Sequence, residues 1–102
     1  EYARYMPSSA IVTKELIDFM KTVTQKTGKK PIVYCNYKFY KQYLERELKN
    51  EHMLWICDFK NEPNGNWHFW QATDQFKIAG VRGTVDFNIF NGTLKKLTEL
   101  LF

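Results

Sequence analysis

The sequence has little with which to build a metal centre or a disulfide framework. It contains 2 cysteines and 2 histidines in 102 residues, with no Cys-x-x-Cys motif and no metal-ligand spacing around the histidines. Cys35 and Cys57 each lie in an apolar, strand-like run, where cysteine behaves as a small buried hydrophobic residue. We therefore interpret both cysteines as structural and predict neither a metal site nor a cofactor.

Long hydrophobic runs are also absent, and no signal-peptide pattern stands at the start of the sequence. We therefore predict no membrane span. The first residue is Glu1 rather than methionine. We interpret the chain as a processed product or a piece of a longer protein, whose missing start would carry any export signal.

Acidic residues do not dominate the charge, since the formal net charge is +4 and the sequence pI is about 9.1. This mild excess of base suits an anionic polymer such as a cell-wall glycan or a nucleic acid. Scattered lysines on predicted helices, however, are typical of solvated helix faces; here they are Lys14, Lys21, Lys26, Lys38, Lys41 and Lys49. We therefore expect no nucleic-acid partner.

The first half of the sequence alternates helix and strand patterns, within a length that allows one domain at most. A first helix is predicted between a Pro7-Ser8-Ser9 start signal and a Gly28 stop. Residues 31–35 and 53–57 are short apolar runs, typical of strands buried in a parallel sheet. The apolar stripe of the first helix consists of Leu16, Phe19, Met20 and Val23.

Between the two apolar runs, Asn36 is placed to cap a second helix. Glu45 and Lys49 form an i,i+4 pair on it. Its apolar face consists of Tyr40, Tyr43, Leu44 and Leu48. Strand-helix-strand units of this kind imply a parallel sheet with helices outside it.

After a turn at residues 61–66, the pattern changes to strands without helices between them. Strands are predicted over residues 67–72 and 84–90, and a final helix over residues 93–101. In the second strand, the apolar residues alternate with Asp86 and Asn88, so these two polar residues share one face.

The segment Trp67-His68-Phe69-Trp70-Gln71 belongs to the first of these two predicted strands, and Asp86 belongs to the second. Together they combine indole rings, an amide and a carboxylate. Aromatic rings stack on the apolar faces of sugars, and glycosidic chemistry needs a carboxylate close by. The structural alternative is that Trp67, Phe69 and Trp70 fill the core while Asp86 ends a strand. Composition alone favours that alternative.

Five sequence blocks, taken in order, favour a sugar-binding site over core packing. They are residues 27–34 (TGKKPIVY), 54–56 (LWI), 69–73 (FWQAT), 80–81 (GV) and 85–92 (VDFNIFNG). In order and approximate spacing they resemble the C-terminal half of the glycoside hydrolase family 25 lysozymes, over about two thirds of the chain. The resemblance implies that residues 1–102 are a partial catalytic domain without its N-terminal half. It also implies an α/β fold, the C-terminal half of a modified TIM-like (β/α) barrel. In that half, β/α units are followed by helix-poor strands and a terminal helix.

The activity implied by the resemblance is that of an N-acetylmuramidase, which cleaves the β-1,4 bond between N-acetylmuramic acid and N-acetylglucosamine in peptidoglycan. Such an enzyme is secreted or acts in the cell envelope, typically of bacteria. The family's catalytic set includes an Asp on the first strand, an Asp-x-Glu motif, and a late Asp that corresponds to Asp86. Its groove-lining positions correspond to Trp70, Gln71, Tyr34 and Trp55.

Glu1 precedes Gly28 by about the interval that separates the family's Asp-x-Glu from its Gly-x-Lys-Pro strand. Glu1 is therefore either the general acid or an ordinary lead-in residue. Asp86 can stabilise charge but cannot also protonate the leaving oxygen. We expect the parent protein to be a lysozyme and this chain alone to be inactive or nearly so.

Half a barrel leaves unpaired sheet edges and an open apolar interior. We therefore expect the chain to pair with the missing N-terminal half or with a second copy. The first alternative function is a non-catalytic cell-wall glycan-binding module. The second, a nucleic-acid binder, lacks the interleaved basic and aromatic residues that single-strand binders show.

Overall fold

The computed structural model describes residues 8–48 and 52–101. The chain forms a sheet of four strands in the order β1-β2-β3-β4, with helices before, within and after it. No helix in these residues is long and apolar enough to cross a membrane. The elements are α2 (Ser9–Thr27), β1 (Val33–Asn36), α3 (Tyr37–Phe39), η1 (Tyr40–Leu44), α4 (Glu45–Leu48), β2 (Leu54–Cys57), β3 (Phe69–Phe76), β4 (Val85–Phe90) and α5 (Leu94–Leu101).

The predicted start and stop signals of α2 are confirmed. The Ser8 side chain accepts a hydrogen bond from the Ile11 backbone N–H at 3.4 Å, and Gly28 adopts the left-handed conformation with φ 76°. The predicted apolar stripe is wrong at one position, because Phe19 is 64% exposed. Met20 is buried, and the preceding residue lies about 100° away around a helix. Phe19 therefore points away from the sheet.

The predicted second helix is present but is not a regular α-helix. Its cap is confirmed, since Asn36 Oδ1 accepts from the Phe39 N–H at 2.7 Å. Its middle, η1, is a π-helix that buries Tyr40 and Leu44. Thr13 Oγ1 of α2 donates to the Tyr43 carbonyl at 3.0 Å, which ties α2 to η1.

The predicted Glu45–Lys49 pair is not tested, because Lys49 lies outside the described residues. Within them, Glu45 instead pairs with Lys41, whose Nζ is 2.8 Å from Glu45 Oε1. Both side chains are solvent-exposed to a large degree, so this pair contributes little to stability.

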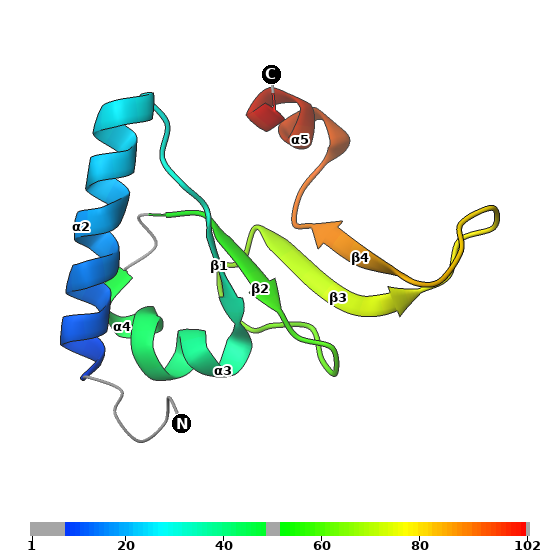
Figure 1. Cartoon of the computed structure of the whole chain (residues 1–102), viewed down its shortest axis with the longest axis horizontal. Helices are drawn as coiled ribbons and strands as arrows, with labels where there is room; N and C mark the ends of the chain where they lie inside the picture. Colours follow the sequence, from blue (N-terminus) through cyan, green and yellow to red (C-terminus); the bar gives the residue numbers. More distant parts are fainter. Residues whose placement is uncertain (1–7, 49–51, 102) are drawn as a thin grey trace.

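Strands β1, β2 and β3 run parallel, and β4 is antiparallel to β3. A helical crossover joins β1 to β2, whereas β3 and β4 are joined directly as a hairpin, which Figure 1 shows projecting from the sheet. The expected order of β/α units, then helix-poor strands, then a terminal helix is confirmed.

The two faces of the sheet differ. Figure 1 shows α2 and the α3–α4 segment together on one side, while α5 follows β4 and lies apart from them. Side chains between the first group of helices and the sheet form the core, so the opposite face lacks that cover. The core residues are Met20, Val33, Tyr40, Leu44, Leu48, Leu54, Ile56 and Trp67.

Candidate active site

The face of the sheet opposite the core carries a pocket with a volume of about 310 Å³. All four strands contribute to it, because alternate residues of a strand point to the same face. Tyr34 is opposite Trp55 in the β1–β2 pair, and Gln71 is opposite Asn88 in the β3–β4 pair. Asp86 completes the lining. The structure thus brings Tyr34, Trp55, Gln71 and Asp86 together, all of them residues that the sequence predicts for the site.

Trp55 is fixed by three neighbours. Its indole Nε1 donates to Asn88 Oδ1 at 2.9 Å. Its ring stacks against Phe69, with ring centroids 4.6 Å apart, and meets the Tyr34 ring edge-on at 6.4 Å. Such contacts hold the indole in one orientation before a ligand arrives, which lowers the entropic cost of binding.

Gln71 is a buried amide at the base of the pocket, with 7% of its surface exposed. Its Oε1 accepts a hydrogen bond from the Tyr34 hydroxyl. Partial burial raises the pKa of Tyr34, and the Cys57 thiol and the charges of Asp86 and Asp74 raise it further. The Tyr34 hydroxyl therefore stays protonated and remains a hydrogen-bond donor at neutral pH.

Asp86 is solvent-exposed on β4 and is the carboxylate that lines the pocket. Within residues 8–48 and 52–101, the ion pairs are Lys14–Asp18 and Lys41–Glu45, so Asp86 has no basic partner there. An exposed carboxylate beside an aromatic platform can accept a hydrogen bond from a ligand or stabilise a developing positive charge. Glu1, the other predicted catalytic residue, lies outside the described residues.

Trp70 is placed elsewhere, although the sequence predicts it in the groove. Its Nε1 donates to the Asp58 carbonyl at 2.8 Å, and its ring packs against the core and edge-on to Trp67. The reason is the alternation of strand side chains, because Trp70 and Gln71 are adjacent and must face opposite sides. Since Gln71 lines the pocket, Trp70 cannot.

Asn88 and Phe69 contribute to the site without being predicted as site residues. Asn88 lines the pocket, and Phe69 stacks under Trp55. Both residues could have been predicted from the alternation of side chains along a strand. Every second residue faces the same side, so Asn88 shares the face of Asp86, and Phe69 shares the face of Gln71.

The cysteines lie on opposite faces of the sheet. Cys35 packs against the core, and burial raises its pKa to about 11, so its thiol stays protonated. Cys57 lies beside Tyr34 on the pocket face. Both are free thiols, and in the described residues no group of His, Cys, Asp or Glu side chains gathers as a metal site would require.

The model of the glycosyl hydrolases family 25 matches residues 1–81. The chain belongs to this family. The match to the family model ends before β4, the strand that carries Asp86 and Asn88. The family 25 chain is also 36% identical over 94 residues to the protein YegX of Escherichia coli (strain K12), covering 88% of this chain and 34% of that protein.

Solved structures match the family 25 chain over nearly all of its length. A family 25 glycosyl hydrolase from Bacillus anthracis is 27% identical with a TM-score of 0.82, covering 96% of this chain and 48% of that one. A muramidase from Acremonium alcalophilum is 26% identical with a TM-score of 0.73, covering 94% and 48%. A bacterial lysozyme from Streptomyces coelicolor shares the fold at 22% identity with a TM-score of 0.80, covering 94% and 48%.

These comparisons agree on the extent of the match. The family 25 chain spans about half the length of the solved structures and about a third of YegX. Its α/β fold therefore corresponds to one half of a family 25 structure.

Proposed function

We propose that the chain forms one wall of the glycan groove of a peptidoglycan-cleaving lysozyme, a 1,4-β-N-acetylmuramidase. The observation that carries this proposal is the pocket on the uncovered face of a family 25 chain. There, an aromatic platform, a buried amide and a carboxylate without an ion-pair partner among the described residues meet from four strands. The bond cleaved would join N-acetylmuramic acid to N-acetylglucosamine, and the protein would act outside the cell or in the cell envelope.

In this proposal Trp55 and Tyr34 contact the sugar rings. Their orientations suit a flat apolar ligand face beside a row of hydrogen-bonding groups. Gln71 orients Tyr34, and Asn88 orients Trp55. Asp86 would hold the substrate's acetamido group or stabilise positive charge at the reacting carbon. Trp70 has no part in sugar contact, because its ring packs with the core.

Asp86 cannot supply the whole chemistry. The leaving oxygen needs a proton from a second carboxyl group, and loss of one general acid lowers the rate by a factor of about 10²–10⁴. Glu1 remains a prediction for that general acid. The chain by itself is therefore proposed to be inactive or nearly so.

A partner would complete the groove. Next to the pocket, the same face of the sheet has an apolar hollow with a volume of about 550 Å³. It is lined by Lys29, Lys30, Ile32, Met53, Trp55, Phe69, Leu97 and Leu100. An apolar hollow of this size is costly to leave in water. We infer that the N-terminal half of the barrel covers it, or, failing that, a second copy of the chain.

Lysis of purified peptidoglycan tests the proposal, in protein whose groove is completed by its N-terminal half. Asp86→Asn keeps the shape of the side chain and removes its charge, and should lower the rate of clearing about 100-fold or more. Asp18→Asn is the matched control, because Asp18 is an exposed carboxylate on α2 that pairs with Lys14 far from the pocket. Equal clearing by the two variants would remove Asp86 from the site.

A non-catalytic glycan-binding module is the second candidate function. It is favoured by the pocket itself, which pairs a sugar-binding platform with a single carboxylate in the described residues. A pull-down on insoluble peptidoglycan separates the two functions when run beside the clearing assay. Retention without clearing by the completed protein supports the module, whereas clearing supports the enzyme.

A further inference from the structure

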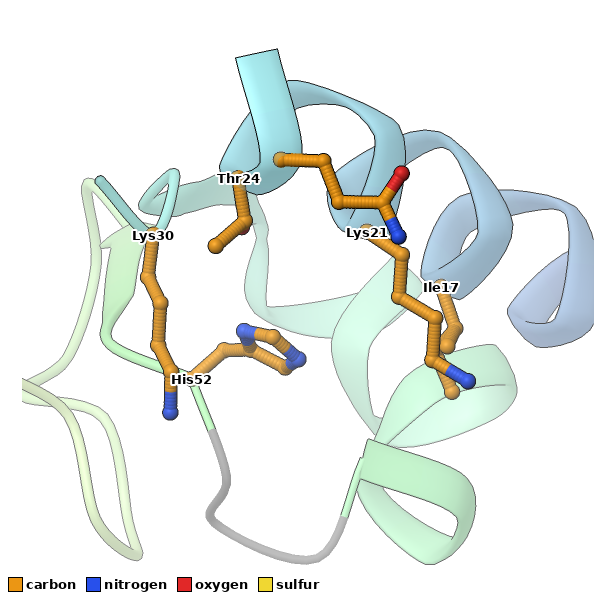
Figure 2. A pocket seen from close by; sticks show the side chains of 6 residues that line it. Ile17, Lys21, Thr24, Lys30 and His52 are labelled. Atoms are coloured by element: carbon orange, nitrogen blue, oxygen red, sulfur yellow. The ribbon is translucent and has the colours of Figure 1, made fainter. Parts of the chain in front are cut away.

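Another pocket lies on the helical side of the molecule, away from the candidate active site. It has a volume of about 280 Å³ and is formed by one face of α2, the loop before β1 and the residue leading into β2. Figure 2 shows its lining residues, which are Ile17, Lys21, Thr24, Gln25, Lys30 and His52. None of its residues lines the pocket of the candidate active site, and Lys30 also borders the apolar hollow beside that site.

The polar groups of this pocket are mostly hydrogen-bond donors. Figure 2 shows the His52 ring extending between the side chains of Lys30 and Lys21. Among the residues that the structure describes, no acidic side chain lines the pocket. The nearest carboxylate along α2, Asp18, pairs with Lys14 at 3.2 Å. In the described part of the chain, neither Lys21 nor Lys30 has an ion-pair partner.

His52 has an unmet hydrogen-bonding need. Its Nδ1 atom is buried and has no hydrogen-bond partner among the described residues. Native proteins seldom leave a buried polar atom unpaired, so such an atom suggests a missing ligand or water. The other histidine behaves normally, because His68 Nδ1 accepts from the Leu54 backbone N–H at 3.2 Å.

We propose that this pocket binds a phosphate-type oxyanion. Two ammonium groups that lie on either side of an imidazole offer charged hydrogen-bond donors to a tetrahedral anion with several acceptor oxygens. The pocket volume of about 280 Å³ leaves room for such an anion. The ligand that we expect is a phosphate group, either free or part of a phosphodiester polymer. This site is independent of the proposed muramidase function.

The test is a titration followed by nuclear magnetic resonance of the histidine ring protons. Inorganic phosphate is raised through the millimolar range against the purified chain, at constant pH and with sodium chloride holding the ionic strength constant. The His52 signals should shift and saturate, while the His68 signals provide the internal control. A diester, glycerophosphoglycerol, forms the second arm: saturation with both ligands indicates a polymer phosphate, and saturation with phosphate alone indicates the free ion.

Substitutions locate the binding. Lys21→Gln and Lys30→Gln should each weaken phosphate binding about threefold, and the double variant about tenfold, because exposed charges are screened by solvent. Lys26→Gln is the matched control, since it removes the same charge from α2 outside the pocket. The proposal is overturned if His52 shows no saturable shift, if acetate gives the same shift at the same concentration, or if Lys26→Gln weakens binding as much as Lys30→Gln.

Discussion

At the scale of single residues, the pocket of the candidate active site depends on groups that hold the aromatic rings in place. Gln71 is 7% exposed and accepts from the Tyr34 hydroxyl, while Asn88 accepts from the Trp55 indole. Neither amide needs to touch the substrate in order to matter. Each amide holds an aromatic ring in place before a ligand binds, so the ring loses less conformational entropy on binding.

Replacing Gln71 with leucine tests this arrangement. Gln71→Leu keeps the size of the side chain and removes the acceptor, so Tyr34 loses its partner. We expect the free energy of unfolding to fall by about 1 kcal/mol, since Tyr34 can turn to water, and binding of peptidoglycan fragments to weaken. Urea unfolding and a fluorescence titration measure the two effects. Gln42→Leu, at an exposed position of η1, should change neither; an equal effect there would contradict the assignment.

Cys35 gives a second prediction at this scale, because its pKa is raised to about 11 by burial. The reactive thiolate is then about 100-fold scarcer than for an ordinary thiol with a pKa near 9, so alkylation at pH 8 should slow by that factor in the folded chain. Peptide mass spectrometry with and without denaturant measures it. Folding stability linked to this thiol is fully present below its ordinary pKa and is lost as the pH rises through about 11. Equal alkylation rates with and without denaturant would contradict its burial.

At the scale of elements, α2 and η1 are joined by one buried hydroxyl. Thr13 is 2% exposed, and its Oγ1 donates to the Tyr43 carbonyl across the helix interface. A π-helix departs from the usual i to i+4 hydrogen bonds, and here one carbonyl of η1 accepts a hydrogen bond from α2. The contact therefore helps to define how α2 lies against the sheet.

Thr13→Val removes this hydroxyl while keeping the branched shape. It leaves the Tyr43 carbonyl buried without its side-chain donor, and we expect the free energy of unfolding to fall by about 1–3 kcal/mol. Thr22→Val is the control, because Thr22 is exposed on α2 and donates to the Asp18 carbonyl of its own helix. Denaturant unfolding of the two variants compares them. Similar losses would mean that Thr13 does not join the elements.

Much of the element order can be predicted from the sequence, because its signals are local. Ser8 and Gly28 bound α2, Asn36 caps the second helix, and alternation in β4 sets Asp86 beside Asn88. The π-helix could not be predicted, since it depends on packing of Tyr40 and Leu44 rather than on a local motif.

Two side-chain positions also required the tertiary structure. Trp70 looks like a groove residue beside Gln71, yet adjacent strand residues face opposite sides, and only the register shows which of them faces the core. Phe19 looks like part of an apolar stripe, yet the line of contact along α2 passes through Thr13 and Met20 instead.

At the scale of the whole molecule, one face of the sheet is packed and the other is open. The open face holds both the pocket of the candidate active site and the apolar hollow, which share Trp55. A partner that covers the hollow would therefore also complete the groove.

The isolated chain should associate through this face. Light scattering during size exclusion is expected to give a mass above that of one chain, and Leu100→Ser, in the hollow, should lower it. Leu94→Ser is the matched control, because Leu94 is 79% exposed on the same helix and does not line the hollow. A stable monomer that binds no hydrophobic dye would show that the face needs no partner.

The central claim is that the open face binds the glycan, and the indole N–H signals of the three tryptophans test it most directly. Trp55 lies in the pocket, Trp67 is buried in the core, and Trp70 packs on the core side. A soluble N-acetylmuramic acid–N-acetylglucosamine oligosaccharide, titrated against isotope-labelled chain, should shift the Trp55 signal in a saturable way and leave the Trp67 and Trp70 signals in place. A saturable shift of Trp70 without Trp55, or no shift of any of the three, would contradict the proposed groove.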